Sequence, residues 1–228
     1  MMMNGLLKSM KHSLPRQIDV LIIFLAEGKV FLPLLRILKQ QDAGRISVNG
    51  KPHRDFIQAA PYLIGIAVYE VLKRILLPEL QAFLSLKWPN DLLWQGRKIS
   101  GILIESAFES EVVNIVVGIG LNIVQSPKIP GRVLTSIRET GSPLITPEAL
   151  AKNILTESKK WFSCWKIGRF PAIRREWLSR TCPKGTILEV GGGKSPVKGR
   201  FVGITDLGHL MIEDHNQKIK CLVTTEMR

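Results

Sequence analysis

The chain has 228 residues, of which 45% are hydrophobic and 22% are charged, and its formal net charge at pH 7 is +13. This composition excludes a disordered chain, and the length suits one good-sized domain plus a small one. The longest apolar run, residues 18–26, is interrupted by Asp19 and is too short to span a bilayer, which takes roughly 20 apolar residues.

The first strong secondary-structure signals lie between residues 61 and 119. Apolar residues recur with a 3.6-residue period from Pro61 to Leu77, which predicts a helix that Pro78 ends. A strand-rich stretch follows, with β-type runs at residues 84–88, 99–105 and 112–119, and residues 92–94 lead into a turn at residues 95–97. The tight connections predict three neighbouring, antiparallel strands there.

A loop and two helices are predicted next. Residues 125–143 are rich in Pro, Gly and Ser and are expected to form a loop. Thr146 suits an N-cap, Pro147 the first helical position and Glu148 the positive end of the helix dipole. The helix that begins there is expected to run to about Trp165, and a shorter one is expected at residues 171–180.

The residue pattern changes after residue 181, where short β-type runs replace helical periodicity. Short β runs at residues 186–190, 197–205, 209–213 and 219–223 are separated by turns rich in Gly, Asp and Asn. This pattern is typical of a small barrel of about five short strands. We therefore expect two domains, residues 1–181 and residues 182–228.

The cysteines and the start of the chain bear on the cellular compartment. Cys164, Cys182 and Cys221 are odd in number and widely spaced, which favours reduced thiols over a disulfide framework or a CxxC metal site. The four histidines are scattered, so no metal cluster of His and Cys is expected. The first residues show no small-residue cleavage pattern and therefore no signal peptide. Together these features predict a cytoplasmic protein that is not bound to a membrane.

The motif KWPND, residues 87–91, places a cation, an indole, a proline and two small polar groups at the end of an apolar strand. Pro89 cannot donate to a strand ladder, so the strand is interrupted and Asn90 and Asp91 are expected to point into a cleft beside the sheet. A carboxylate such as Asp91 can hold Mg²⁺, which prefers carboxylate and phosphate oxygens. Trp88 is expected in the core.

A second motif, RKISGILIE at residues 97–105, follows a turn. If residues 92–98 form a hairpin, Lys98 returns beside Asp91, where its compact charge suits a phosphate or a developing negative charge. Gly101 indicates close approach of a ligand or another backbone, and GIGLN at residues 118–122 repeats this feature. The alternative interpretation is a surface salt bridge on a hairpin, with glycines tolerated at bends.

The ordered set KWPNDLLWQGRKISGILIES, followed by VVGIGLNI, resembles the catalytic core of biotin–protein ligases, also called biotin–[acetyl-CoA-carboxylase] ligases. The stretch GTILEV…GRFVGITDLGHLMIE is similar to the small SH3-like barrel that closes those enzymes, and the agreement extends over residues 59–226. The resemblance implies an α+β fold, in which a mixed or antiparallel sheet packs with helices as in class II synthetases, plus a C-terminal SH3-like β-barrel.

The resemblance also implies a two-step reaction. The biotin carboxylate attacks the α-phosphorus of ATP, which gives biotinyl-5′-adenylate and pyrophosphate, and a specific lysine of an acceptor protein then attacks the adenylate. The expected cofactors are ATP and Mg²⁺, and biotin is the substrate. The expected partner is the biotin carboxyl carrier domain of a carboxylase.

The family's functional residues carry over onto matching positions of this sequence. Lys98 would contact the biotin carboxylate and the α-phosphate, and Asp91 would support Mg²⁺ binding and the reacting amine. Other residues would organise the phosphates, line the biotin pocket or lie along the nucleotide site. These are Gln41, Arg45, Lys87, Asn90, Gly101, Leu103, Gly118, Gly120 and Asn122.

The N-terminal part departs from the family pattern. Members carry a Ser-Thr-Asn motif that binds the biotin ureido group, and residues 16–21 (RQIDVL) replace it here. Members also carry a QxAGRGRxGR loop that folds over the adenylate. Residues 41–45 match its first half, and residues 46–50 (ISVNG) replace the second. Ser47 cannot supply the forked, charge-assisted hydrogen bonds of the lost guanidinium.

Three functions remain open at this point. The first is a single-function biotin–protein ligase. The second is a catalytically impaired paralogue that binds biotin, adenylate or the carrier without turnover. The third is a basic nucleic-acid-binding protein, suggested by the net charge alone. The positive charge is densest at residues 151–181, with eight Lys and Arg against two Asp and Glu, which is either a solvated face or a docking surface.

The start of the chain and the edge of the central sheet indicate which binding partners to expect. The 40 residues that precede Gln41 leave no room for a helix-turn-helix extension, so DNA binding as a repressor is not expected. An exposed edge of the central sheet would allow sheet extension with a second copy, giving a homodimer, or with the carrier.

Overall fold

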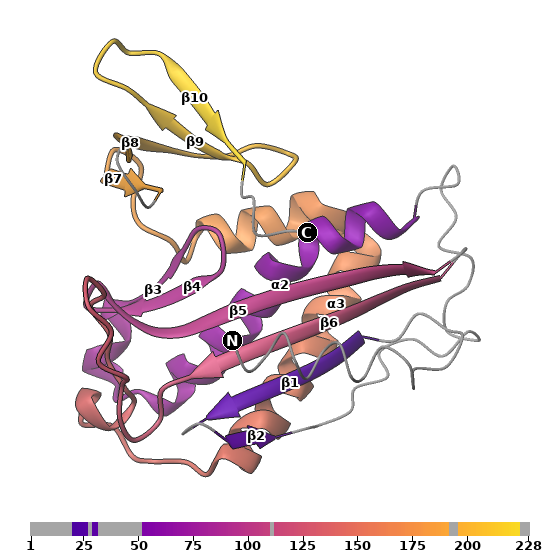
Figure 1. Ribbon diagram of the computed structural model, residues 1–228, viewed down its shortest axis with the longest axis vertical. Coiled ribbons are helices and arrows are strands. Elements are labelled where there is room, and N and C mark those ends of the chain that lie inside the picture. The colour runs from indigo at the N-terminus through magenta and orange to yellow at the C-terminus, as the bar shows by residue number, and fades with distance from the viewer. Residues whose placement is uncertain (1–19, 27–28, 32–51, 110–111, 192–195, 224–228) are drawn as a thin grey trace.

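Two sheets and two long helices make up the described part of the chain. The computed structural model describes residues 20–26, 29–31, 52–109, 112–191 and 196–223 (Figure 1). The elements in chain order are β1 (Val20–Ala26), β2 (Lys29–Phe31), α2 (Pro52–Ile75), η1 (Pro78–Phe83), β3 (Leu84–Lys87), β4 (Asp91–Trp94), β5 (Arg97–Glu109), β6 (Val112–Leu121), η2 (Arg138–Thr140), α3 (Pro147–Leu178), β7 (Ile187–Val190), β8 (Val197–Ile204), β9 (Leu210–Glu213) and β10 (Ile219–Leu222).

The central sheet is mixed and has the strand order β2-β1-β6-β5-β4-β3. The predicted stretch between residues 84 and 121 forms four antiparallel strands, one more than expected, because residues 91–94 make a strand of their own. Strand β1 pairs parallel with β6, and β2 turns back antiparallel to β1. Both long helices lie behind this sheet in Figure 1, so the predicted sheet packed with helices is confirmed.

Helix α2 starts earlier than the sequence predicted. It begins at Pro52, and Pro61, expected in the first turn, lies inside it. The buried side chains of Phe56, Ala59 and Ala60 extend the apolar face upstream of the proline, and this burial outweighs the one backbone hydrogen bond that a proline removes. Residues 56–75 are long and apolar enough to cross a membrane by composition, but 78% of that window is buried. Packing against α3 and the sheet accounts for their apolar character.

Helix α3 follows the predicted signals closely. The Thr146 side chain accepts a hydrogen bond from the backbone N–H of Ala149 at 3.3 Å, and Pro147 is the first helical residue. The helix is broken by a kink at Arg169, whose φ of 52° is non-helical, two residues before Pro171. The two predicted helices are therefore the two segments on either side of this kink.

The C-terminal sheet has four antiparallel strands in the order β10-β9-β8-β7, and they match the four predicted β runs. Four of its side chains, Phe201, Ile204, Leu210 and Ile212, are buried and join the main hydrophobic core. Among the described residues the sheet has no further strand, so closure into an SH3-like barrel stays a prediction. The division into domains 1–181 and 182–228 likewise stays a prediction.

Candidate active site at the KWPND turn

A β-bulge sets the side chain of Lys98 beside Asp91. Strand β4 pairs Leu92 with Ser100 but Leu93 with Lys98, which leaves Ile99 as the extra residue. Since side chains alternate between the two faces of a strand, the extra residue moves Lys98 onto the face that Asp91 and Leu93 share. The ammonium of Lys98 and the carboxylate of Asp91 form an ion pair there. The predicted meeting of these two residues is confirmed.

Gly101 leaves room for this ion pair. It lies opposite Asp91 in the β4–β5 register. A Cβ added at Gly101 would lie 2.8 Å from Nζ of Lys98 and 3.3 Å from Oδ1 of Asp91, which is closer to the nitrogen than real Cβ atoms come. The glycine was predicted to mark the approach of a ligand or another backbone. In the structure a lysine and a carboxylate side chain occupy the space that a larger residue would need.

The KWPND turn is held against β5 by its own amide group. Asn90 Nδ2 donates to the carbonyl of Ile102 at 2.7 Å, and the N–H of Ile102 donates to the carbonyl of Asn90 at 2.9 Å. These bonds fix the residue that precedes Asp91. Lys87 lies opposite Asp91 in the β3–β4 register and is exposed. The peptide bond between Trp88 and Pro89 is cis.

Trp88 connects the KWPND turn to the C-terminal sheet. Its indole N–H donates to the carbonyl of Gly208 at 3.0 Å and to the hydroxyl of Tyr62 at 3.1 Å. The Tyr62 hydroxyl donates in turn to the same Gly208 carbonyl. Burial raises the pKa of Tyr62, so the phenol stays protonated as this donor. Trp88 was predicted to be a core residue, and it packs half-buried against the core while also making this polar connection.

The loop that carries Gly208 is fastened at two further points. Gln58 Nε2 donates to the carbonyl of Asp206 at 3.0 Å, and Arg174 Nε donates to the carbonyl of Ile204 at 2.7 Å. One donor comes from α2 and the other from α3. The C-terminal sheet is thus tied to the turn that holds Asp91 and to both helices.

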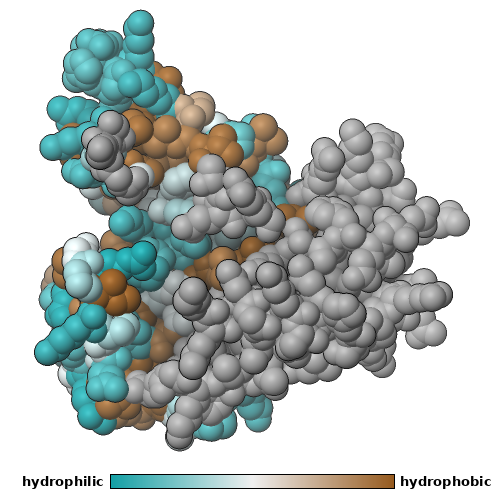
Figure 2. All heavy atoms as spheres, in the orientation of Figure 1, coloured by the Kyte–Doolittle hydropathy of each residue, from teal (hydrophilic) through white to brown (hydrophobic). Residues whose placement is uncertain are grey.

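A first cleft, with a volume of about 850 Å³, opens between the KWPND turn and the C-terminal sheet. One wall carries Lys87, Asp91 and Lys98, and the facing wall is built from apolar side chains together with Glu189. Figure 2 shows the hollow between the C-terminal part, at the top of the view, and the body of the protein, with hydrophobic side chains on the C-terminal side. The apolar side chains are Val190, Val197, Leu222 and Val223.

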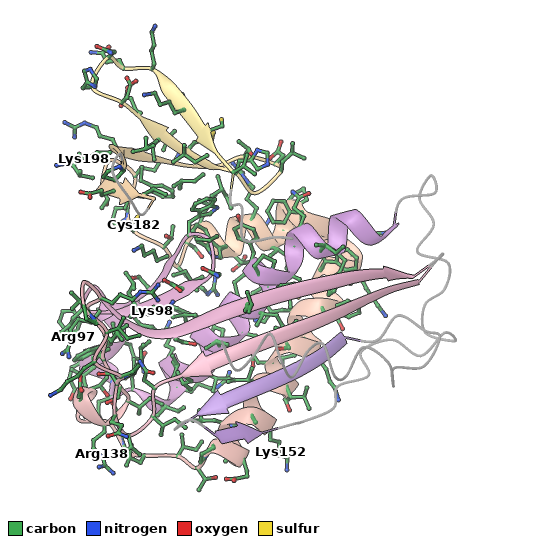
Figure 3. The ribbon with its side chains drawn as sticks, viewed as in Figure 1. Arg97, Lys98, Arg138, Lys152, Cys182 and Lys198 are labelled. Carbon is green, nitrogen blue, oxygen red and sulfur yellow. The ribbon has the colours of Figure 1, made fainter. Side chains whose placement is uncertain are left out.

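A second cleft, of about 780 Å³, lies beside the glycine pair of β5 and β6. Gly101 and Gly120 face each other in register, and a Cβ at Gly120 would come no closer than 3.8 Å to another residue. Asn122 also lines this cleft, and its Nδ2 donates to the carbonyl of Thr135 at 2.8 Å. Lys98 lines both clefts, as do Arg132 and Leu134; Figure 3 shows Lys98 near the start of β5, beneath the C-terminal sheet.

The remaining predicted residues lie farther out or outside the described structure. Leu103 and Gly118 pair with each other, two residues along β5 and β6 from the Gly101–Gly120 pair. Within the described structure they line neither of the two clefts. Gln41 and Arg45 lie outside the described residues. The binding roles of all these residues stay predictions.

Two cations of the 125–143 loop were not predicted as site residues. Lys128 lines the second cleft, and Arg132 lines both clefts. Their signal in the sequence was weak, since each is one basic residue among Pro, Gly and Ser. The connection between Tyr62 and Gly208 was also missed, because it joins residues far apart in the chain.

The donor set does not form a complete metal site in the described part of the chain. No group of three or more His, Cys, Asp and Glu side chains gathers there, and the carboxylate of Asp91 is already paired with Lys98. Mg²⁺ is commonly held by one or two carboxylates together with substrate phosphates. The role of Asp91 in Mg²⁺ binding therefore stays a prediction that depends on a nucleotide supplying the other oxygens.

Comparisons with known proteins agree with this geometry. Residues 48–122 match the model of the biotin/lipoate A/B protein ligase family. A biotin–[acetyl-CoA-carboxylase] ligase of Paracoccus denitrificans is 31% identical over 157 residues, which cover 66% of this chain and 65% of that protein. The bifunctional ligase/repressor BirA of Bacillus subtilis is 30% identical over 148 residues, covering 63% of this chain and 45% of that protein.

A solved structure is similar in fold as well as in sequence. The biotin protein ligase of Aquifex aeolicus in complex with biotin and ATP superposes with a TM-score of 0.58 at 26% identity, over 75% of this chain and 69% of that one. The matched region spans less than two thirds of the two curated relatives' length. The KWPND turn, the following β5–β6 hairpin and these similarities agree on one assignment. The chain belongs to the biotin–protein ligase family.

Proposed function

We propose that the protein attaches biotin to a specific lysine of a biotin carboxyl carrier domain, using ATP and passing through biotinyl-5′-adenylate. The observation that carries the proposal is the Lys98–Asp91 ion pair at the junction of two clefts, beside a pair of glycines. The similarity to biotin–[acetyl-CoA-carboxylase] ligases supports biotin as the group attached, and the Aquifex aeolicus complex supports biotin and ATP as the ligands.

The first step is a displacement at phosphorus. A carboxylate oxygen of biotin forms a bond to the α-phosphorus of ATP, and the bond between that phosphorus and the bridging oxygen breaks, so pyrophosphate leaves with the electron pair. Both reactants are anions, so the site must offset their repulsion. The ammonium of Lys98 is the compact cation suited to lie between them. Asp91 holds that ammonium, and Gly101 keeps the space around it open.

The second step is an acyl transfer. The acceptor lysine, as a free amine, forms a bond to the carbonyl carbon of the mixed anhydride, and AMP leaves as the carbon–oxygen bond breaks. The nitrogen loses one proton in this step, and the proton passes to solvent. The carboxylate of Asp91 would attract and orient the incoming amine, as a negative group at the edge of the first cleft. Mg²⁺, where it takes part, would arrive on the phosphates of ATP.

The partner and the compartment follow the same proposal. The acceptor would be a carboxylase carrier domain in the cytoplasm, and pairing of two copies along a sheet edge stays a prediction. Nucleic-acid binding is less well supported, because four of the eight cations of the basic segment, residues 151–181, form ion pairs with carboxylates. Lys160 pairs with Glu157, and Arg175 and Arg180 both pair with Glu176.

Two assays test the proposal. The purified chain is incubated with ATP, labelled pyrophosphate and biotin, and label entering ATP is measured; a carrier domain is then added and its biotinylation is followed by mass. We expect exchange that depends on biotin, followed by transfer to one lysine. Tight binding of biotin or adenylate without exchange would instead identify an impaired paralogue.

A further inference from the structure

The chain segment that leaves α3 pairs with the edge of the central sheet. Strand β3 is the last strand of that sheet, and the N–H of Leu86 donates to the carbonyl of Arg180 at 2.8 Å. The Thr181 hydroxyl donates to the carbonyl of Leu86 at 2.7 Å, and Leu86 and Thr181 form a parallel bridge. Residues 180 and 181 thereby satisfy both backbone polar groups of Leu86.

Arg180 anchors this segment to both long helices. Its Nε donates to Oε1 of Glu70 on α2 at 2.8 Å, and its Nη1 donates to Oε2 of Glu176 on α3 at 3.0 Å. The guanidinium carbon also lies 5.8 Å from the ring centroid of Tyr69 and 5.5 Å from that of Trp161, one ring from each helix. Two charge-assisted hydrogen bonds and two ring contacts leave the guanidinium little freedom. The backbone at residues 180 and 181 is therefore a fixed support for β3.

The peptide group that Thr181 holds is the first of the KWPND turn. The Leu86 carbonyl lies in the same planar unit as the N–H of Lys87, and Lys87 faces Asp91 in the β3–β4 register. Lys87 and Asp91 both line the first cleft, and in the described structure neither of them lines the second. A shift of this peptide group would therefore move a wall of the first cleft.

Lys98 is held independently of Thr181. Its N–H donates to the carbonyl of Val133, and its carbonyl accepts from the N–H of Thr135, both at 2.9 Å. These bonds come from the loop that follows β6, whereas Thr181 follows α3. The two charged groups of the Lys98–Asp91 ion pair are therefore supported by different parts of the chain.

We propose that Thr181 is a positioning residue for the transfer of biotin to the acceptor lysine. The inference rests on the proposed function, in which Asp91 orients the incoming amine at the edge of the first cleft. The Thr181 hydroxyl keeps the Leu86–Lys87 peptide group in place, and through it the strand end that presents Asp91. Loss of the hydroxyl slows transfer, while adenylate formation continues because Lys98 keeps its own backbone support.

Separate rates for the two steps test this inference. The full chain is compared with Thr181→Val, which keeps the side-chain shape but loses the hydroxyl, with Thr181→Ser, which keeps the hydroxyl, and with Thr186→Val. Thr186 is the matched control, because its hydroxyl donates to the carbonyl of Pro183 at 2.7 Å, between α3 and β7 but outside the bridge to Leu86. Biotin-dependent pyrophosphate exchange measures the first step. Single-turnover transfer from biotinyl-5′-adenylate to a carrier domain, at several carrier concentrations, separates the transfer rate constant from the affinity for the carrier.

We expect Thr181→Val to lower the transfer rate constant about tenfold, with little change in pyrophosphate exchange or in carrier affinity. Thr181→Ser and Thr186→Val should stay near the wild type, and amide hydrogen exchange at residues 84–91 should become faster in Thr181→Val alone. Equal losses in both steps, transfer at the wild-type rate in Thr181→Val, or a Thr181→Ser variant as slow as Thr181→Val would overturn the inference. A wild-type chain without pyrophosphate exchange would instead refute the proposed function; unchanged hydrogen exchange in Thr181→Val would then also show that Thr181 does not hold the turn.

Discussion

Trp88 and Gly208, separated by 120 positions in the chain, are joined by a hydrogen bond of 3.0 Å from the indole N–H to the glycine carbonyl. The tryptophan belongs to the turn that presents Asp91, and the glycine belongs to the loop between β8 and β9. Gly208 has φ of +74°, and a Cβ there would lie 3.0 Å from the Tyr62 ring. The candidate active site and the C-terminal sheet are therefore built against each other at this contact.

Trp88→Phe should loosen the C-terminal sheet while the fold is kept. The phenylalanine ring still packs against the core, but the indole donor to Gly208 is lost, which costs about 1 kcal/mol of unfolding free energy. Hydrogen exchange measured by mass spectrometry should become faster in residues 205–209. Trp94→Phe is the matched control, since its indole donates to Leu80 at 3.3 Å, outside the C-terminal sheet. Equal exchange of that loop in both variants would contradict the connection.

Gly101→Ala should lower the rate of biotin-dependent pyrophosphate exchange about 100-fold, since misplacement of a catalytic group by about 1 Å has an effect of that size. The added Cβ would displace Lys98, whose Nζ lies 2.8 Å from its position. Gly65→Ala is the control, because the nearest atom to its Cβ is 3.4 Å away on the Leu86 side chain. Exchange at the wild-type rate in Gly101→Ala would show that the reaction does not require the Lys98–Asp91 ion pair at this position.

Asp214 should make the β9–β10 turn sensitive to acid. A hydrogen bond from Lys220, followed by one from the N–H of Lys218, lowers the pKa of Asp214 to about 2. Because the pKa is lower in the folded than in the unfolded state, the ionised carboxylate stabilises the fold. This stabilisation is fully present above pH 4, about the pKa of Asp in an unfolded chain, and is lost as the pH falls towards 2. In Asp214→Asn the free energy of unfolding should depend less on pH between pH 2 and pH 4. An Asp214→Asn variant whose pH dependence equals that of the wild type would contradict this assignment.

The strands and the helix start at Thr146 could be predicted because their signals are local. Alternating apolar residues and a proline after an N-cap need no knowledge of distant contacts. The start of α2 could not be placed in the same way. Pro61 favours a first helical turn over a helix interior, and it is the burial of Phe56 and Ala59 that extends the helix upstream of it.

The candidate site was predictable in its members but not in its geometry. The hairpin spacing was enough to bring Lys98 back to Asp91. The bulge at Ile99, which decides the face of Lys98, depends on the pairing register with β4, and no single residue signals it. Arg132 reaches the site only because the backbone of residues 133–135 pairs with Lys98, a contact between segments that the sequence does not relate.

Biotin-dependent pyrophosphate exchange in the wild type and in Lys98→Ala tests the central claim most directly. The variant should keep its fold, because the Lys98 side chain is 31% exposed at a cleft, and Lys152→Ala, an exposed change on α3, should serve as the control. We predict exchange in the wild type and in Lys152→Ala, and a rate at least 100-fold lower in Lys98→Ala, as for loss of a group that stabilises developing charge. Exchange at the wild-type rate in Lys98→Ala would contradict the account.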